Sequence, residues 1–309
     1  MDRLEIDHQV VLFASSERMD QLQDGEVGLV ITSPPYWNLK DYDHPDQIGQ
    51  ETYEGYLERM NGVWRECARV ASENAVLAIN VGNRRVNKRF YPIGWDIYSR
   101  MPEPWKLIDN LIWYIPNALP QPNYYKESLF DDKYENVLLF AKNLRYEHTF
   151  NKMRVRQKYS AADPRRGKRN PRGRCIGNVI RIPAYKPPNI KELGYYKAGF
   201  PEELVYLLIH TFSNRGDTVL DPFLGSGTTL KVARNTGRKG VGYEINPDLR
   251  ELIGRRVSEK WTPPDFEDLD IIHSSSNVPG MNGRVRRSDL RGRRLENGYH
   301  ESVERPRSD

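Results

Sequence analysis

The stretch that decides how this chain is expected to fold is Asp221-Pro222-Phe223-Leu224-Gly225-Ser226-Gly227-Thr228-Thr229. An apolar stretch at 218–220 leads into it, and apolar residues at helical spacing follow it at 230, 232 and 233. A second apolar stretch, 240–243, then ends in Glu244. This order of strand, glycine loop, helix and strand indicates an α/β sheet. Its loop glycines let the backbone approach a ligand, and the acid can bind ribose hydroxyls.

Two better-known glycine loops do not fit this stretch. The dinucleotide fingerprint requires a third glycine where Leu230 stands, and the phosphate-binding loop requires a Gly-Lys-Ser/Thr sequence that is missing. A ligand with a ribose but no pyrophosphate fits better, and S-adenosylmethionine is such a ligand. The alternative, a tight turn between strand and helix that binds nothing, stays open.

A second stretch, Gly28-Leu29-Val30-Ile31-Thr32-Ser33-Pro34-Pro35-Tyr36-Trp37, runs from an apolar strand into two prolines. Because proline fixes φ and has no N–H, the Ser33 hydroxyl and the Pro34 carbonyl remain as acceptors on a stiff loop beside an aromatic ring. Such acceptors suit the exocyclic amino group of a stacked base, although a Pro-Pro pair is also common in plain turns. Both stretches follow parallel strands, so we expect them to line one crevice.

The remaining pattern agrees with a doubly wound α/β sheet. Apolar residues between 53 and 68 predict one face of a helix, further helices are predicted from Pro201 and from Asn246-Pro247, and strands are predicted at 10–13, 75–81, 111–114 and 136–142. We expect residues 1–150 and 201–261 to form the sheet domain, 151–200 to be an inserted segment, and 262–309 to be a disordered tail. The tail contains an Arg-rich stretch, which we expect to add nonspecific affinity for nucleic acid.

Charge is distributed unevenly along the chain. The net charge is +5, but residues 151–200 carry 14 basic and 2 acidic side chains, whereas residues 1–150 carry 16 basic and 23 acidic ones. A basic block of this kind is typical of a segment that faces a polyanion, and a solvated loop is the alternative.

Composition excludes several classes of protein. The chain of 309 residues has only two cysteines and six scattered histidines, which predicts no disulfide framework and no metal site. No apolar run is long enough to span a bilayer, and the N-terminus has no apolar signal segment. We therefore expect a cytoplasmic protein associated with nucleic acid.

Taken together, the two motifs resemble those of the amino-directed DNA methyltransferases that use S-adenosylmethionine, in the permuted order with Ser-Pro-Pro-Tyr first. The resemblance covers about residues 10–260 and implies a Rossmann-like methyltransferase sheet. In that family the Ser-Pro-Pro-Tyr form is most often found in cytosine-N4 enzymes, which implies methylation of N4 on a cytosine flipped out of duplex DNA. An adenine-N6 enzyme, an RNA methyltransferase and a non-catalytic nucleic-acid-binding protein remain alternatives.

The resemblance also implies roles for individual residues. The catalytic residues would be Ser33, Pro34, Pro35 and Tyr36. The cofactor would be bound by Asp221, Phe223, Gly225, Ser226, Gly227, Thr228 and Glu244, with Phe200 and Pro201 closing its pocket. DNA would be bound by Arg165, Arg166, Lys168, Arg169, Arg172 and Arg174. The partners would be duplex DNA and a cognate restriction endonuclease, with the choice between monomer and dimer left open.

Two further points concern the chemistry. The family usually has Gly-Asp after its first strand, whereas Phe13 is followed here by Ala14-Ser15-Ser16. Methylation at cytosine C5 is excluded because it needs a thiolate nucleophile, typically after proline. Cys67 follows Glu66 in an apolar helix stripe, and Cys175 follows Arg174 in the basic segment.

Overall fold

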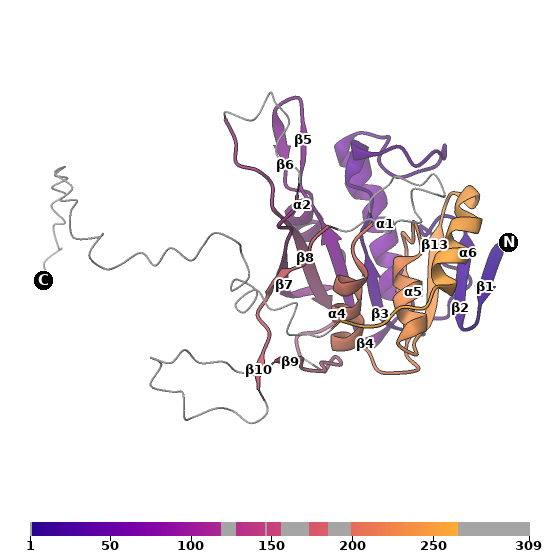
Figure 1. Cartoon of the computed structure of the whole chain (residues 1–309). Coiled ribbons are helices and arrows are strands. Elements are labelled where there is room, and N and C mark those ends of the chain that lie inside the picture. The colour runs from indigo at the N-terminus through magenta and orange to yellow at the C-terminus, as the bar shows by residue number, and fades with distance from the viewer. Residues whose placement is uncertain (1, 119–127, 146, 156–172, 185–198, 265–309) are drawn as a thin grey trace, which may run out of the picture. The chain divides into compact units, whose positions relative to one another are not determined.

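The computed structural model describes residues 2–118, 128–145, 147–155, 173–184 and 199–264, and one large sheet organises them (Figure 1). Its strands lie in the order β1-β2-β13-β12-β3-β4-β8-β7-β11. They are β1 (Arg3–Ile6), β2 (Gln9–Phe13), β3 (Val27–Thr32), β4 (Ala71–Val81), β7 (Lys106–Tyr114), β8 (Tyr134–Ala141), β11 (Val179–Arg181), β12 (Thr218–Asp221) and β13 (Lys239–Glu244). Two small sheets accompany it, one of β5 (Arg84–Val86) and β6 (Arg89–Tyr91), the other of β9 (Arg154–Val155) and β10 (Arg174–Cys175).

The centre of the large sheet is parallel. Strands β2, β13, β12, β3 and β4 pair in parallel, whereas β8 runs antiparallel between β4 and β7. Parallel neighbours need long crossover connections, which helices supply. The carboxyl ends of β3, β4, β12 and β13 therefore meet at one edge of the sheet, called the carboxyl edge below.

Helices cover both faces of this sheet, with α1 (Tyr53–Val70) on one face and α4 (Glu202–Phe212) and α5 (Thr228–Asn235) on the other. Successive side chains of a strand point to opposite faces, so β3 contributes to both cores. Val30 packs with the residues of α1, while Leu29 and Ile31 pack with those of α4. The predicted doubly wound, mostly parallel α/β sheet is confirmed.

The helix predicted from the apolar spacing between 53 and 68 is confirmed as α1. Thr52 caps its start, because the Thr52 hydroxyl accepts a hydrogen bond from the Gly55 amide at 3.2 Å. Leu57, Met60 and Trp64 lie on its buried face. Tyr56, also buried in α1, donates its hydroxyl proton to the Pro35 carbonyl at 2.8 Å, which joins α1 to the loop that follows β3.

Some boundaries differ from the predicted ones. Strand β4 begins at residue 71 and β7 at residue 106, earlier than predicted, because exposed and half-exposed polar residues such as Glu73, Asn74 and Asp109 break the apolar pattern there. The last helix begins with a 3₁₀ turn, η2 (Pro247–Leu249), before α6 (Arg250–Ser258). Asn246 caps that turn as predicted, by accepting a hydrogen bond from the Asp248 amide. Several short elements were not predicted from the sequence, among them β1, the pair β5 and β6, and the short helix α2 (Ile93–Ser99).

The basic segment 151–200 is described only in part. Its strand β11 pairs in parallel with β7, with Ile180 beside Trp113, so this part of the segment belongs to the large sheet. The division at residues 150, 200 and 261 stays a prediction. The tail from residue 265 onward, with its predicted disorder, lies outside the described residues. Within the described ranges, every helix is too short or too polar to cross a membrane.

We expect Leu57→Ala to lower the free energy of unfolding by about 2–5 kcal/mol, because Leu57 is 2% exposed in the core under α1. Glu58→Ala, at the exposed neighbouring position of the same helix, serves as the control and should change it by less than about 0.5 kcal/mol. Urea unfolding of both variants measures the difference. Equal effects would contradict the packing of α1 described above.

Candidate active site

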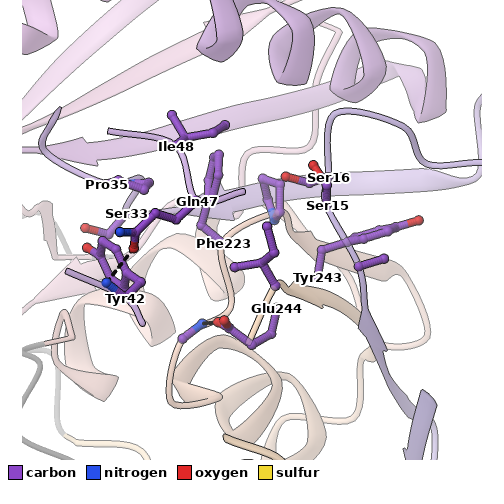
Figure 2. Close-up of a pocket in the computed structure, with 14 residues that line it drawn as sticks. Ser15, Ser16, Ser33, Pro35, Tyr42, Gln47, Ile48, Phe223, Tyr243 and Glu244 are labelled. Carbon is purple, nitrogen blue, oxygen red and sulfur yellow. Dashed lines mark hydrogen bonds between the residues drawn. The ribbon is translucent and has the colours of Figure 1, made fainter. Parts of the chain in front are cut away.

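The loop after β12 and the end of β13 line a first pocket at the carboxyl edge (Figure 2). It holds about 550 Å³ of empty space, including open solvent at its mouth. Its walls are formed by Ala14, Ser15, Ser16, Ser33, Pro35, Tyr42, Gln47, Ile48, Pro222, Phe223, Gly225, Tyr243, Glu244 and Ile245. The wall combines apolar and aromatic faces with one carboxylate, a combination that can contact a flat ring and accept hydrogen bonds from sugar hydroxyls.

Glu244 supplies that carboxylate and is 8% exposed. One of its oxygens accepts a hydrogen bond from the Gly225 amide at 2.8 Å, and the other accepts one from the Asn246 amide at 2.9 Å. Burial raises the pKa of the Glu244 carboxyl to about 7, although these two amide hydrogen bonds oppose the rise. Each oxygen keeps a further lone pair for a ligand hydroxyl.

The glycine loop needs glycine at two positions. Gly225 has φ of +56° and Gly227 has φ of +89°, a left-handed backbone that side chains disfavour. A Cβ on Gly227 would lie 3.1 Å from the Cγ2 atom of Val257 in α6. These glycines let the chain turn from β12 into α5 against a packed helix.

Asp221, which the sequence assigned to the cofactor, lines neither pocket of the site. Its carboxylate is buried and accepts hydrogen bonds from the hydroxyls of Thr32 at 2.8 Å and Thr229 at 2.6 Å, and from the Phe223 amide at 3.1 Å. Burial raises the pKa of the Asp221 carboxyl to about 6. In this structure Asp221 ties the end of β3 to the glycine loop and the start of α5.

The glycine loop also rests on a buried ionic group. Arg256 of α6 donates from Nε to the Ser226 carbonyl at 3.0 Å and from Nη2 to the Thr228 hydroxyl at 3.1 Å. The same guanidinium contacts the Glu202 carboxylate at 3.2 Å, which Lys231 also contacts at 3.3 Å. Arg256 and Glu202 are 1% and 4% exposed, so this group is a structural support and not a ligand site.

A second pocket adjoins the first and holds about 1070 Å³ of empty space, again including open solvent. Ser33, Tyr42, Phe223 and Gly225 line both pockets. The second pocket is also lined by Pro34, Tyr36, Leu39, Lys40, Asn80, Trp113, Ile115, Glu135, Ala184, Gly199, Phe200, Leu224, Ser226 and Thr228. The loop after β3 is therefore part of the wall between the two pockets.

A chain of hydrogen bonds lies along the second pocket. Tyr36 donates its hydroxyl proton to Glu135 at 2.7 Å, and the Ser33 hydroxyl lies 3.2 Å from the Tyr36 hydroxyl. The Asn80 amide donates to the same Glu135 oxygen at 2.7 Å and to Tyr36 at 3.1 Å. Since the Tyr36 proton is directed to Glu135, Ser33 is the donor to Tyr36. The Ser33 oxygen also accepts a long hydrogen bond from the Asn80 amide at 3.5 Å, and its other lone pair remains for a ligand. Burial raises the pKa values of both the Glu135 carboxyl and the Tyr36 hydroxyl.

Strand register explains why these residues meet. Thr32 of β3 pairs with Ile79 of β4, so Ser33 and Asn80 are the next residues along two neighbouring parallel strands. On the other side of β4, Asn136 of β8 pairs with Val81, which brings Glu135 to the carboxyl edge. Sequence reasoning missed Asn80 and Glu135, because this register was the only signal and it is visible only once the strands are paired.

The other predicted residues fall in different places. Pro34 and Phe200 line the second pocket, and Pro35 lines the first. Pro201 precedes the first residue of α4 and lines neither pocket. Although Ala14-Ser15-Ser16 departs from the family pattern, all three residues line the first pocket.

The predicted DNA-binding residues Arg165, Arg166, Lys168, Arg169 and Arg172 lie outside the described residues. Arg174 is described, and it lies in β10, where it donates a hydrogen bond to the Cys175 carbonyl at 3.0 Å. Cys67 is fully buried in α1, and burial raises the pKa of its thiol, which excludes it as a nucleophile. In the described part of the chain, no group of three or more His, Cys, Asp or Glu side chains is placed to hold a metal ion.

An open α/β sheet with a glycine loop, a buried carboxylate at the end of β13 and an adjoining pocket lined by hydrogen-bond acceptors suits a methyltransferase. The chain belongs to the DNA methylase family, which residues 27–255 match. DNA methylases of this N4/N6 class take their methyl group from S-adenosylmethionine, and the walls of the first pocket fit that cofactor. The family resemblance seen in the sequence is thereby confirmed.

Relatives and solved structures agree. The chain is 30% identical to the type II methyltransferase M.XycI of Xanthomonas campestris pv. cyanopsidis, over 77% of this chain and 83% of the relative. A structure of a Thermus thermophilus protein described as a DNA modification methylase is 28% identical, with a TM-score of 0.55 over 80% of this chain and 93% of that one. The PvuII DNA methyltransferase, which is cytosine-N4-specific, shares the fold at 18% identity, with a TM-score of 0.62 over 81% of this chain and 92% of that one.

We expect the affinity for S-adenosylmethionine to fall as the pH falls through the pKa of Glu244, which burial raises to about 7. Protonation replaces an acceptor of a ribose hydroxyl by a donor, so affinity should drop about tenfold between about pH 8 and pH 6. Glu244→Gln should bind about ten- to a hundredfold more weakly, without that pH dependence. Calorimetric titration measures both, and an equally pH-dependent Glu244→Gln protein would show that another group is responsible.

Proposed function

We propose that this protein is a site-specific DNA methyltransferase that methylates the exocyclic N4 of a cytosine flipped out of duplex DNA. The observation that carries the proposal is the hydrogen-bonded chain Ser33–Tyr36–Glu135, which lies in a pocket that shares a wall with the cofactor pocket. A flipped base in the second pocket would bring its amino group to that shared wall.

Two acceptors, one on the shared wall and one beside it, would orient the amino group. The lone pair of a base's amino nitrogen is delocalised into the ring, so attack on a methyl group requires that pair to be localised on nitrogen. The Ser33 oxygen and the Pro34 carbonyl can each accept one N–H, which favours the localised geometry as positive charge develops. The ring of Tyr36, whose hydroxyl is held by Glu135, would then stack on the base.

Glu135 takes the proton that the amino group loses. Bound S-adenosylmethionine supplies an electrophilic methyl group and keeps the electron pair of the broken carbon–sulfur bond. As nitrogen gains that methyl, its N–H proton passes to Ser33, the Ser33 proton passes to Tyr36, and the Tyr36 proton passes to Glu135. The raised pKa of Glu135, caused by burial, strengthens this carboxylate as the final acceptor.

The choice of cytosine over adenine is supported by Ser33, because the Ser-Pro-Pro-Tyr form is most often found in cytosine-N4 enzymes. The same pocket chemistry would also suit an adenine-N6 enzyme, and a single-stranded RNA base could reach it in the same way. A protein that bound the cofactor but methylated nothing would be a non-catalytic relative. The base analysis described below separates these cases.

The proposal includes partners. The curated relatives are named type II methyltransferases, which supports a role in protecting DNA from a cognate restriction endonuclease with the same recognition site. The basic segment 151–200 would supply the sequence recognition, including Arg165, Arg166, Lys168, Arg169, Arg172 and Arg174. The activity would take place in the cytoplasm, where the DNA of bacteria and archaea lies.

We expect nucleosides from DNA modified by the wild-type protein to contain N4-methyldeoxycytidine, measured by mass spectrometry after expression in a methylation-free bacterium.

Ser33→Ala should lower kcat by about a hundredfold, the size of one hydrogen bond to a transition state, with cofactor affinity nearly unchanged. Ser258→Ala removes an exposed serine of α6 and serves as the control. N6-methyldeoxyadenosine as the sole product would overturn the cytosine assignment, and full turnover by Ser33→Ala would overturn the acceptor role.

We expect Glu135→Gln to lower kcat by about a hundredfold with little change in KM for DNA, because glutamine accepts the Tyr36 hydrogen bond but cannot take the proton. The wild-type kcat should fall as the pH falls through the pKa of Glu135, and this acid limb should be missing in the variant. Tyr36→Phe, which keeps the stacking ring, should show the same loss of kcat. An unchanged pH profile in Glu135→Gln would refute the proton path.

A further inference from the structure

The hairpin of β5 and β6 was not expected from the sequence and has no role in the site described above. It begins directly after β4, at the carboxyl edge of the sheet, and stands out from the large sheet (Figure 1). Its strands pair Arg84 with Tyr91 and Val86 with Arg89. Asn87 and Lys88 form the turn with φ of +49° and +68°, the geometry of a tight two-residue hairpin turn.

The hairpin is strongly basic. It carries Arg84, Arg85, Lys88 and Arg89, and residues 81–95 contain no acidic side chain. This concentration of charge occurs within residues 1–150, which as a whole carry 16 basic and 23 acidic side chains. A local positive patch in an acidic part of the chain indicates a polyanionic partner.

Aromatic rings hold two of these cations in place. The Arg85 guanidinium lies 4.6 Å from the centre of the Phe90 ring, and that of Arg89 lies 4.9 Å from the centre of the Tyr91 ring. The Phe90 ring is 41% exposed. The Nε atom of Arg85 is buried, and it has no hydrogen-bond partner among the described residues. Cations held on aromatic rings need little further ordering when they bind phosphate.

Direct contacts join the hairpin to the loop that carries Ser33 and Tyr36. The Tyr91 ring lies 5.0 Å from that of Trp37, and Nε of Arg84 donates to the Asn38 side chain at 3.4 Å. Trp37 directly follows Tyr36, which lines the second pocket. A ligand on the hairpin would therefore lie next to whatever occupies that pocket.

We propose that the β5–β6 hairpin binds the phosphate backbone of duplex DNA beside the extruded nucleotide. The inference rests on the proposed function, because it assumes that the second pocket takes a base from DNA. Phosphate contacts fix the position of a protein on a duplex, and a flipped base has to be held while its neighbours stay stacked. The hairpin thus supplies DNA contacts from a part of the chain far from the basic segment 151–200.

The test replaces Arg85, Lys88 and Arg89 together by serine and measures duplex affinity against salt concentration. Each lost phosphate contact should flatten the log–log salt slope by about 0.9, up to about 2.7 for three contacts. The control is the triple serine variant at Lys106, Arg215 and Lys239, which removes the same charge at the opposite edge of the sheet. A second variant, Lys88→Ser with Arg89→Ser, changes only the two exposed cations in case Arg85 is needed for folding.

The hairpin variants should bind duplex DNA more weakly on any sequence and with a flatter slope, while their affinity for S-adenosylmethionine stays at the wild-type value. The control variant should keep the wild-type slope. Equal slopes for the wild type, the hairpin variants and the control would overturn the inference and leave the methyltransferase activity standing. If the wild type itself neither bound nor methylated DNA, the proposed function would fail instead.

Discussion

The arrangement of the site depends on the buried carboxylate of Asp221. One of its oxygens accepts from the Thr32 hydroxyl, at the end of β3, and the other accepts from the Thr229 hydroxyl, at the start of α5. Thr32 and Asp221 are 189 residues apart in the sequence, so no local interaction holds the end of β3 beside the glycine loop. Because an unpaired buried hydroxyl or carboxylate is costly, the three groups stabilise one relative position of the two motifs. The wall between the two pockets is built on that position.

Most of the fold could be predicted because its strands and helices bury continuous apolar surface. The centre of the sheet is covered on both faces, and this makes its strands nearly uninterrupted apolar runs, as in 28–31 and 137–140. Elements with one exposed face gave weaker signals. The β5–β6 hairpin has no buried residue, so it lacks the pattern that identifies a strand. Strand β1 alternates polar and apolar residues, but over four positions only, which is too short to stand out.

The site could be predicted only where a motif is continuous in the sequence. Ser33, Pro34 and Glu244 could be singled out because Ser33 and Pro34 directly follow an apolar strand and Glu244 ends one. Asn80 and Glu135 stand in ordinary strand sequences, and their meeting with Tyr36 depends on the pairing of β4 with β3 and β8. Asp221 could be singled out because it belongs to the glycine-loop motif. Its place under the loop, away from the pocket wall, is set by its hydrogen bonds to Thr32 and Thr229, and the sequence spacing does not show these hydrogen bonds.

The common wall of the two pockets has a thermodynamic consequence. Ser33, Tyr42, Phe223 and Gly225 each line both pockets, so the free energy of binding a ligand in one pocket includes any change that this ligand causes in the surface of the other pocket. Linkage makes this effect reciprocal: the factor by which a bound base alters cofactor affinity equals the factor by which the bound cofactor alters base affinity. If the cofactor and a flipped base occupy these two pockets as proposed, the affinity for each of them has to be measured both with and without the other bound.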